Sequence, residues 1–166
     1  MMKNKLLLIF IGITVLAVAG FLVFKQTNIS GEPTSFNLIF KYGVGAKNEL
    51  NTFNQTYTKD MVMAPPVTIK FKLPDSEMAG LRQKIEDLKL FDKNEKPAEG
   101  DISMMKIPCS SYYLKAQINS VQKELSWDDC QGKISDKLKQ FMEYIIPIIE
   151  AKDEYKKLPE REGSYM

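Results

Sequence analysis

Few side chains in this sequence could carry out catalysis, because none of its 166 residues is a histidine. That absence excludes Ser-His-Asp and Cys-His catalysis, histidine-ligated zinc sites and pH switches based on imidazole. Glycosidase chemistry would need two carboxylates about 5–10 Å apart across a cleft. Asp60, Glu124 and Asp128 are the candidates for such a pair in a cell-wall enzyme. No recognisable catalytic motif contains them, so we predict that the chain is not an enzyme and uses no cofactor.

Cys109 and Cys130 are the two cysteines, and their spacing fits a disulfide across a β-hairpin. Residues 112–118 and 121–127 both have the composition of strands, and Asn119-Ser120 lies between them as a two-residue turn. In that register the numbers of paired residues add to 239, as those of Cys109 and Cys130 do. The two cysteines would form a non-hydrogen-bonded pair with Cα atoms about 4.5 Å apart, which a disulfide tolerates.

The same register explains the pattern of the hairpin. It places Leu114 opposite Leu125 on a face that is apolar except for Lys123, and Lys115 opposite Glu124 on the other face. An alternative role for the cysteines is a metal or catalytic site that includes Asp128-Asp129-Cys130. That segment lacks partner ligands at a known spacing.

A possible binding surface lies in residues 52–62, which are rich in threonine and aromatic residues and predict a strand. Asn54, Tyr57, Lys59 and Asp60 are its candidate residues. The alternative is an edge strand whose polar side chains satisfy the local backbone and solvent. Tyr112 and Trp127 could likewise form a platform for a ligand, but packing within the hairpin is the simpler interpretation.

Two further strands and two helices are expected to position these residues. Residues 36–42 and 67–73 alternate between apolar and polar side chains. Gly43 and Gly45 end the first of these strands, and Pro65-Pro66 is expected to break the strand at 52–62.

The first helix is predicted to begin near Pro74, with Asp75 or Ser76 as its N-cap. A loop over 92–106 follows it, and a second helix runs from Gly132 to about residue 152, with Pro147 expected to kink or interrupt it. Each helix has apolar residues at spacings of three and four: Met78, Leu81, Ile85, Leu88 and Phe91 in the first, and Ile134, Leu138, Phe141, Ile145 and Ile148 in the second. The order βββ-α-ββ-α favours an α+β fold with an antiparallel sheet and a disulfide-stapled hairpin, preceded by a transmembrane helix.

That transmembrane helix is predicted for residues 6–24, nineteen residues without a charge that would span about 28 Å as a helix. Lys3 and Lys5 precede the run and Lys25 follows it, which favours a cytoplasmic N-terminus at residues 1–5. We therefore predict a single-pass cell-membrane protein that contacts the lipid bilayer through this helix. A linker at 25–35, an extracytoplasmic domain at 36–160 and a flexible tail at 161–166 follow.

A cleaved signal peptide is the alternative interpretation of the same run. Ala17-Val18-Ala19 fits the small-x-small pattern, so cleavage after Ala19 would release a secreted protein. Against cleavage, the apolar run continues to residue 24. Of the 23 Lys and Arg residues, three flank the run, so residues 26–166 carry 20 against 21 Asp and Glu, a net charge of −1. A near-neutral domain without a basic block is not expected to bind nucleic acid.

Three segments carry a resemblance to known proteins: residues 51–61, the helix start Pro74-Asp75-Ser76-Glu77, and residues 154–159. They resemble small, uncharacterised membrane-anchored and lipoprotein-like extracytoplasmic proteins of Gram-positive bacteria, over about residues 36–160. The resemblance implies an extracytoplasmic location and no established activity. Many such proteins carry a lipidation cysteine, which this sequence lacks before Cys109.

These observations lead to three hypotheses about function. The first is a membrane-anchored extracytoplasmic binding or accessory domain, with a protein, a peptide or cell-wall material as partner. The second is a secreted inhibitor or ligand-sequestering protein released after Ala19. The third is the carboxylate-based cell-wall enzyme.

Overall fold

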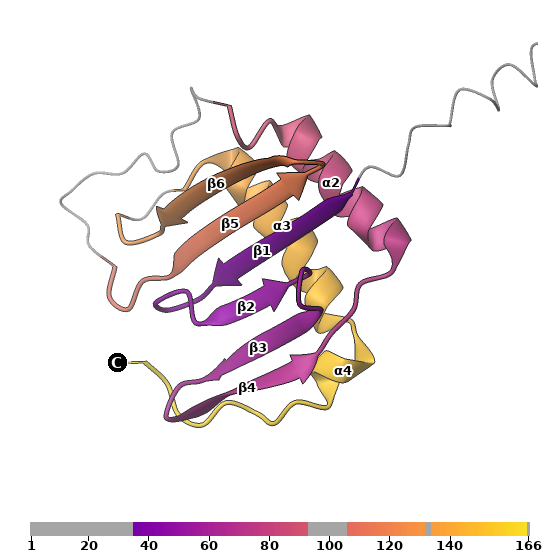
Figure 1. The fold of residues 1–166 in the computed structure, drawn as a ribbon. Coiled ribbons are helices and arrows are strands. Elements are labelled where there is room, and N and C mark those ends of the chain that lie inside the picture. Colours follow the sequence, from indigo (N-terminus) through magenta and orange to yellow (C-terminus); the bar gives the residue numbers. More distant parts are fainter. Residues whose placement is uncertain (1–34, 93–105, 132–133, 166) are drawn as a thin grey trace, which may run out of the picture. The chain divides into compact units, whose positions relative to one another are not determined.

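A computed structural model describes residues 35–92, 106–131 and 134–165 of the chain. The described residues form a six-stranded antiparallel sheet with helices packed on one face (Figure 1). The elements in chain order are β1 (Phe36–Tyr42), β2 (Asn48–Asn51), β3 (Thr56–Met61), β4 (Ala64–Lys70), α2 (Asp75–Leu88), β5 (Ser111–Ile118), β6 (Val121–Asp128), α3 (Asp136–Glu150) and α4 (Asp153–Lys156). The strands lie in the order β4-β3-β2-β1-β5-β6, which confirms the predicted α+β class with an antiparallel sheet.

The core lies on the face of the sheet that the helices cover. Alternate residues of a strand point to the same face, so one row of apolar side chains crosses all six strands. In the observed register that row consists of Ile69, Tyr57, Leu50, Phe40, Leu114 and Leu125. Phe40, near its centre, is fully buried, and its ring contacts Phe141 of α3 edge-on at 5.6 Å between centroids.

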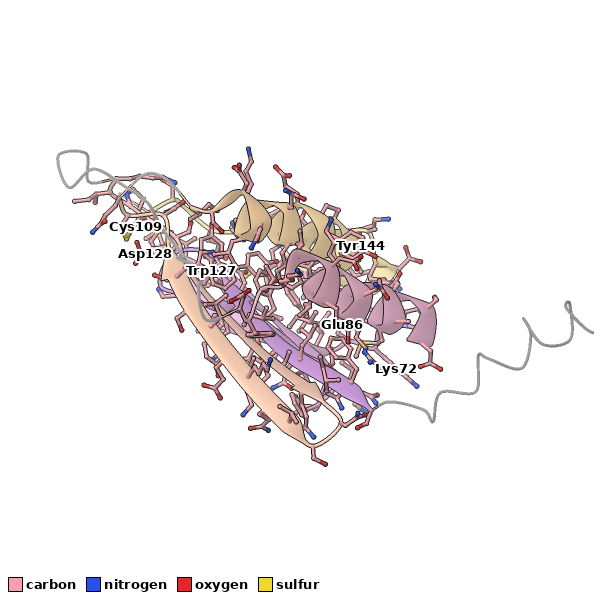
Figure 2. The ribbon with its side chains drawn as sticks, turned by 90° about the horizontal axis from the view of Figure 1, so that it is seen from above. Lys72, Glu86, Cys109, Trp127, Asp128 and Tyr144 are labelled. Carbon is pink, nitrogen blue, oxygen red and sulfur yellow. A yellow bond between two sulfur atoms is a disulfide. The ribbon has the colours of Figure 1, made fainter. Side chains whose placement is uncertain are left out.

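Helices α2 and α3 pack their apolar residues onto this row, and Figure 2 shows both on one side of the sheet. Leu81 and Ile85 of α2 are buried, as are Leu138, Phe141, Met142, Ile145 and Ile149 of α3. Pro147 lies within α3, which ends three residues later at Glu150. Ile149 takes the fully buried place predicted for Ile148, which is half-buried beside the core. Among the described residues no helix lies on the opposite face, which we call the open face.

The predicted hairpin is confirmed in its register. Tyr112 pairs with Trp127, Leu114 with Leu125 and Lys115 with Glu124. Lys115 Nζ lies 3.6 Å from a carboxylate oxygen of Glu124 on the open face. On the other face, Trp127 is buried and stacks on Tyr112 with ring centroids 5.3 Å apart, so these two rings pack within the fold.

The predicted disulfide is also confirmed. Cys109 and Cys130 are joined with their Cα atoms 4.8 Å apart, just beyond the paired ends of β5 and β6. Lys106 and Asp129 form an ion pair of 2.7 Å close to this bond. Because both cysteines are in the disulfide, neither is available as a metal ligand in this structure.

The prediction of one strand over 52–62 is wrong. In the structure the strand in this range, β3, begins only at Thr56, residues 52–55 form a turn, and a further strand, β2, precedes the turn at Asn48–Asn51. The turn forms because Asn51 Oδ1 accepts the backbone N–H of Asn54 at 3.1 Å, and because Gln55 adopts a left-handed φ of 53°. The hydroxyl of Thr52 accepts the N–H of Leu38 at 2.8 Å, which ties the turn to β1. Within the described residues the order of elements is therefore ββββ-α-ββ-α-α and not βββ-α-ββ-α.

Pro65 and Pro66 do not break a strand either, because both lie within β4. This strand forms one edge of the sheet, where a residue without an N–H can be accommodated. The helix that follows, α2, begins at Asp75. The predicted N-caps, Asp75 or Ser76, would have placed its first residue at least one position later. Pro74 is the N-cap of α2, without a side-chain cap bond, and its carbonyl accepts the N–H of Met78 at 3.0 Å.

The predicted transmembrane run at 6–24, its flanking residues 1–5, the cleavage position after Ala19 and nearly all of the linker at 25–35 lie outside the described residues. Within residues 35–92, 106–131 and 134–165, no helix is long and apolar enough to cross a membrane.

Candidate functional site

The four residues predicted as a binding surface do not share one surface in the structure. Asn54 is exposed in the turn between β2 and β3, whereas Tyr57 is fully buried on the helix-covered face. The Tyr57 hydroxyl hydrogen-bonds the hydroxyl of Tyr42 at 2.7 Å. Burial raises the pKa of both phenols well above the usual value of 10. Tyr57 is therefore a core residue.

Lys59 is also buried on the helix-covered face, at the end of the sheet near α4. Its ammonium donates to the carbonyl oxygen of Pro159 at 2.8 Å and lies 5.3 Å from the centre of the Tyr155 ring. A buried ammonium needs such partners, because an unpaired charge inside a protein is strongly unfavourable. Its partners come from α4 and from the segment after it, residues 157–165, which we call the tail segment.

Asp60, the next residue, lines the open face and is only 5% exposed. Its backbone N–H donates to Asn48 Oδ1 at 3.1 Å, and its Oδ1 accepts the N–H of Val62 at 3.1 Å. Its second carboxylate oxygen, Oδ2, accepts a hydrogen bond from the hydroxyl of Tyr165. The tail segment thus contacts Lys59 from one face of β3 and Asp60 from the other.

Asp60 lies in a hollow of about 430 Å³ on the open face, over β1 to β4. The groups in it balance in charge, with two lysines and two carboxylates. Lys41 and Glu49 form an ion pair of 3.0 Å across β1 and β2, and the hydroxyls of Thr58 and Thr68 lie 2.9 Å apart on β3 and β4. The lining residues are Lys41, Gly45, Ala46, Lys47, Glu49, Thr58, Asp60, Val62, Ala64 and Pro66.

One wall of the hollow is the turn between β1 and β2. Gly43 and Gly45 both have positive φ, at 90° and 66°, which most side chains resist. A Cβ at Gly43 would also lie 2.7 Å from Asn48 Nδ2, whose donated bond to the Tyr42 carbonyl closes the turn. The turn carries Lys47 to the rim of the hollow, opposite Asp60.

The tail segment reaches the same hollow. Glu162 forms a parallel bridge with Val62 and donates its N–H to the carbonyl of Met61 at 3.3 Å. Tyr165, three residues on, has its hydroxyl between Asp60 Oδ2 and Lys47 Nζ, and the lysine donates at 3.0 Å. Lys47 Nζ also lies 5.0 Å from the centre of the tyrosine ring. The hydrogen bond with Tyr165 raises the pKa of Lys47, which is fully exposed.

The sheet order separates the carboxylates of the enzyme hypothesis. Asp60 is on β3 and Glu124 and Asp128 are on β6, with β2, β1 and β5 between them. Four interstrand spacings place Asp60 about 19 Å from β6, and four residues along β6 place Glu124 about 13 Å from Asp128, so no two of the three have the 5–10 Å spacing of a glycosidase pair. Glu124 is paired with Lys115, and Asp128 Oδ1 accepts the N–H of Cys130 at 2.9 Å. Within the described residues, no cluster of three or more Cys, Asp or Glu side chains could hold a metal ion.

Three residues of the hollow, Lys41, Lys47 and Glu49, and Tyr165, which contacts two of its residues, were missed at the level of sequence. The ion pair between Lys41 and Glu49 had a usable signal, because Gly43 and Gly45 mark a turn. Had residues 48–51 been interpreted as a strand, the two side chains would have been placed opposite each other. Tyr165 had no such signal, since it meets Asp60 across a sequence separation of 105 residues.

The chemistry of the hollow suits binding. It offers positively charged hydrogen-bond donors and negatively charged acceptors on the face of the sheet that the described helices leave uncovered. The chain matches no protein-family model, and no curated protein sequence matches it.

Proposed function

We propose that this chain is a membrane-anchored extracytoplasmic binding domain, with the hollow on the open face as its binding site. The observation that carries the proposal is the hollow itself. The sheet buries one face under helices, and the other face carries balanced charges around a depression of about 430 Å³. Specific binding sites commonly combine such a depression with a few well-placed polar groups.

The disulfide supports the extracytoplasmic part of the proposal. Disulfides persist in oxidising compartments and are rare in the reducing cytosol. The charge-free run at 6–24 would hold the domain at the membrane. An oxidising location for residues 35–166 agrees with the orientation that the flanking lysines favour.

The charge balance of the hollow limits the choice of partner. Lys41 and Lys47 are matched by Glu49 and Asp60, so the site offers no field that would attract the phosphates of a nucleic acid. A polar segment of a protein or peptide, or a cell-wall glycan, suits the mixture of donors and acceptors.

Location is tested by N-terminal sequencing of the protein from fractionated bacterial cells, together with protease treatment of spheroplasts. We expect the full chain in the membrane fraction, starting at Met1 or Met2, with the domain degraded by protease added outside. A protein that starts at Gly20 in the medium would contradict anchoring and support the secreted alternative. A domain protected from protease would contradict the orientation.

Binding is tested by placing a photo-crosslinking amino acid at Thr68, which is exposed on the open face beside the hollow. The matched control is the same amino acid at Gln140, which is exposed on α3 in the helix layer. Irradiation of intact cells should yield a reproducible adduct from position 68 that is absent from position 140. Identical adducts from both positions, or none from position 68, would refute the proposed site.

A further inference from the structure

We propose that Asp60 and Lys47, two of the residues that line the hollow, bind a tyrosine side chain from a partner protein or peptide, and that Tyr165 takes this position as an intramolecular ligand. This inference rests on the proposed function, since it names the chemistry of the partner. It makes the tail segment a competitor that an incoming tyrosine must displace.

The first step in the argument is the contact between Asp60 and Tyr165. Asp60 is 5% exposed, and its Oδ1 is already bonded to the N–H of Val62. Its Oδ2 accepts a hydrogen bond from the phenol of Tyr165. Hydrogen bonds to a carboxylate are about twice as strong as those between neutral groups, so a hydroxyl donor is favoured at this position.

The second step is the contact with Lys47, which selects an aromatic ring. The ammonium donates to the Tyr165 hydroxyl at 3.0 Å and lies 5.0 Å from the ring centre, within reach of a cation–π interaction. A phenol is therefore recognised three times, as donor to Asp60, as acceptor from Lys47 and through its ring. A phenylalanine would make one of these contacts, and a carboxylate ligand would be repelled by Asp60.

The third step is that the tail segment is attached outside the hollow. Leu158 is buried in the core, the carbonyl of Pro159 accepts from Lys59, and Glu162 bonds to Met61. Gly163, with a φ of 80°, turns the chain toward the open face. Tyr165 can therefore leave Asp60 and Lys47 while residues 158–162 stay in place.

A tethered ligand of this kind weakens the binding of a free one. Short flexible tethers give effective concentrations in the millimolar range. An isolated tyrosine side chain, with few atoms and three weak contacts, should have a Kd in the same range or above. The tether raises the apparent Kd of a free ligand by one plus the ratio of its effective concentration to the Kd of a tyrosine side chain, so removing Tyr165 should lower the apparent Kd of a small tyrosine probe by about twofold.

The experiment uses the full-length chain in detergent micelles, titrated with N-acetyl-tyrosine amide while NMR follows the backbone amides of Ala46 and Asp60. The variant Tyr165→Ala should give saturable shifts at a concentration about twofold lower than the unsubstituted chain. Tyr144→Ala is the matched control. Tyr144 on α3 is 37% exposed and lies 5.7 Å from Lys84 Nζ, so its loss removes a comparable ring contact far from the hollow. It should leave the probe affinity unchanged.

Specificity is measured with N-acetyl-phenylalanine amide, which should bind Tyr165→Ala at least fivefold more weakly than the tyrosine probe. The double variant Tyr165→Ala/Asp60→Asn should lose most of that discrimination, and Tyr165→Ala/Lys47→Met should weaken both probes. Because Asp60 is buried, the amide spectrum of each variant is compared with that of the unsubstituted chain, and the Lys47 variant tests the site where the Asp60 variant fails to fold.

Equal affinity of Tyr165→Ala and the unsubstituted chain for the tyrosine probe would overturn the inference. Equal affinity of Tyr165→Ala for the two probes would overturn it as well. Saturable binding of an N-acetylglucosamine oligosaccharide without binding of the tyrosine probe would show that the hollow takes a glycan. Crosslinking at Thr68 does not depend on Tyr165, so an adduct there together with a negative titration would refute the tyrosine ligand and leave the proposed function standing.

Discussion

Removing the disulfide between Cys109 and Cys130 should destabilise the domain by an amount that follows from the chain length it closes. The two cysteines are 21 residues apart in the sequence. In the chain-entropy model, closing a loop of that size lowers the entropy of the unfolded chain and raises its free energy by about 3.3 kcal/mol at 25 °C. The domain has about 130 residues, so its unfolding entropy of about 2.1 cal/mol/K per residue converts this loss into a fall in Tm of about 12 °C.

The measurement compares the full-length chain with the double variant Cys109→Ala/Cys130→Ala, both on heating, which gives Tm, and in urea. Trp127, the single tryptophan, is buried against Tyr112 and reports unfolding by its fluorescence. Because the bond acts mainly on the unfolded chain, its loss should also expand that chain and raise the dependence of the unfolding free energy on urea.

The controls and the contrary results are specific. The unsubstituted chain with a phosphine reductant should unfold as the double variant does, and the reductant should leave the double variant unchanged. A fall in Tm of less than about 3 °C would refute the reasoning from loop closure. A large destabilisation without a steeper urea dependence would place the effect in the folded state, contrary to the chain-entropy account.

Three other predictions follow from the core and the sheet edge. Phe40→Ala should lower the unfolding free energy by about 3–5 kcal/mol in urea titrations, because Phe40 is fully buried. The control Phe53→Ala, at a residue 38% exposed, should lower it by less than about 0.5 kcal/mol. Equal losses for the two variants would contradict the assigned core. Burial raises the pKa of Tyr42 and Tyr57 in the folded chain, so their contribution to stability is complete below pH 10 and is lost above it. Raising the pH from 9 to 11 should lower the unfolding free energy by about 2.8 kcal/mol through these two phenols. The Tyr42→Phe/Tyr57→Phe variant should therefore lose about 2.8 kcal/mol less over the same range than the unsubstituted chain. Identical pH profiles of the two would refute the assignment. Lys123 lies on the otherwise apolar face of the edge strand β6, so Lys123→Val should increase self-association in analytical ultracentrifugation, and an unchanged monomer fraction would argue against an edge-protecting role.

The hairpin was predictable because its information is local. Two apolar strands with a two-residue turn admit few registers that keep one face apolar. The register chosen on that ground also paired Lys115 with Glu124 and aligned the cysteines, so three independent features agreed. The helices were predictable for a similar reason, since their apolar residues recur within a single segment.

The strands around the hollow were less predictable because tertiary contacts decide them. Thr52 favours a strand by type and Asn54 favours a turn, and the turn forms because Thr52 bonds to Leu38 on a neighbouring strand. Pro65-Pro66 breaks a strand in the interior of a sheet but not at its edge, and the position of β4 depends on the order of all six strands.

Lys59 and Asp60, the two charged residues of the predicted binding surface, are buried in the structure. The physical reason also distinguishes two parts of the tail segment. Lysine and aspartate are rarely buried without partners, so their types alone favour an exposed position. Lys59 and Asp60 are buried because the tail segment, about 100 residues away in the sequence, supplies Pro159 to one and Tyr165 to the other. The two contacts differ in consequence. Withdrawal of Pro159 would leave an ammonium buried without its acceptor, whereas withdrawal of Tyr165 opens Asp60 to solvent or to another hydroxyl in the hollow. The first contact therefore belongs to the folded core, and the second is the one that a ligand can replace.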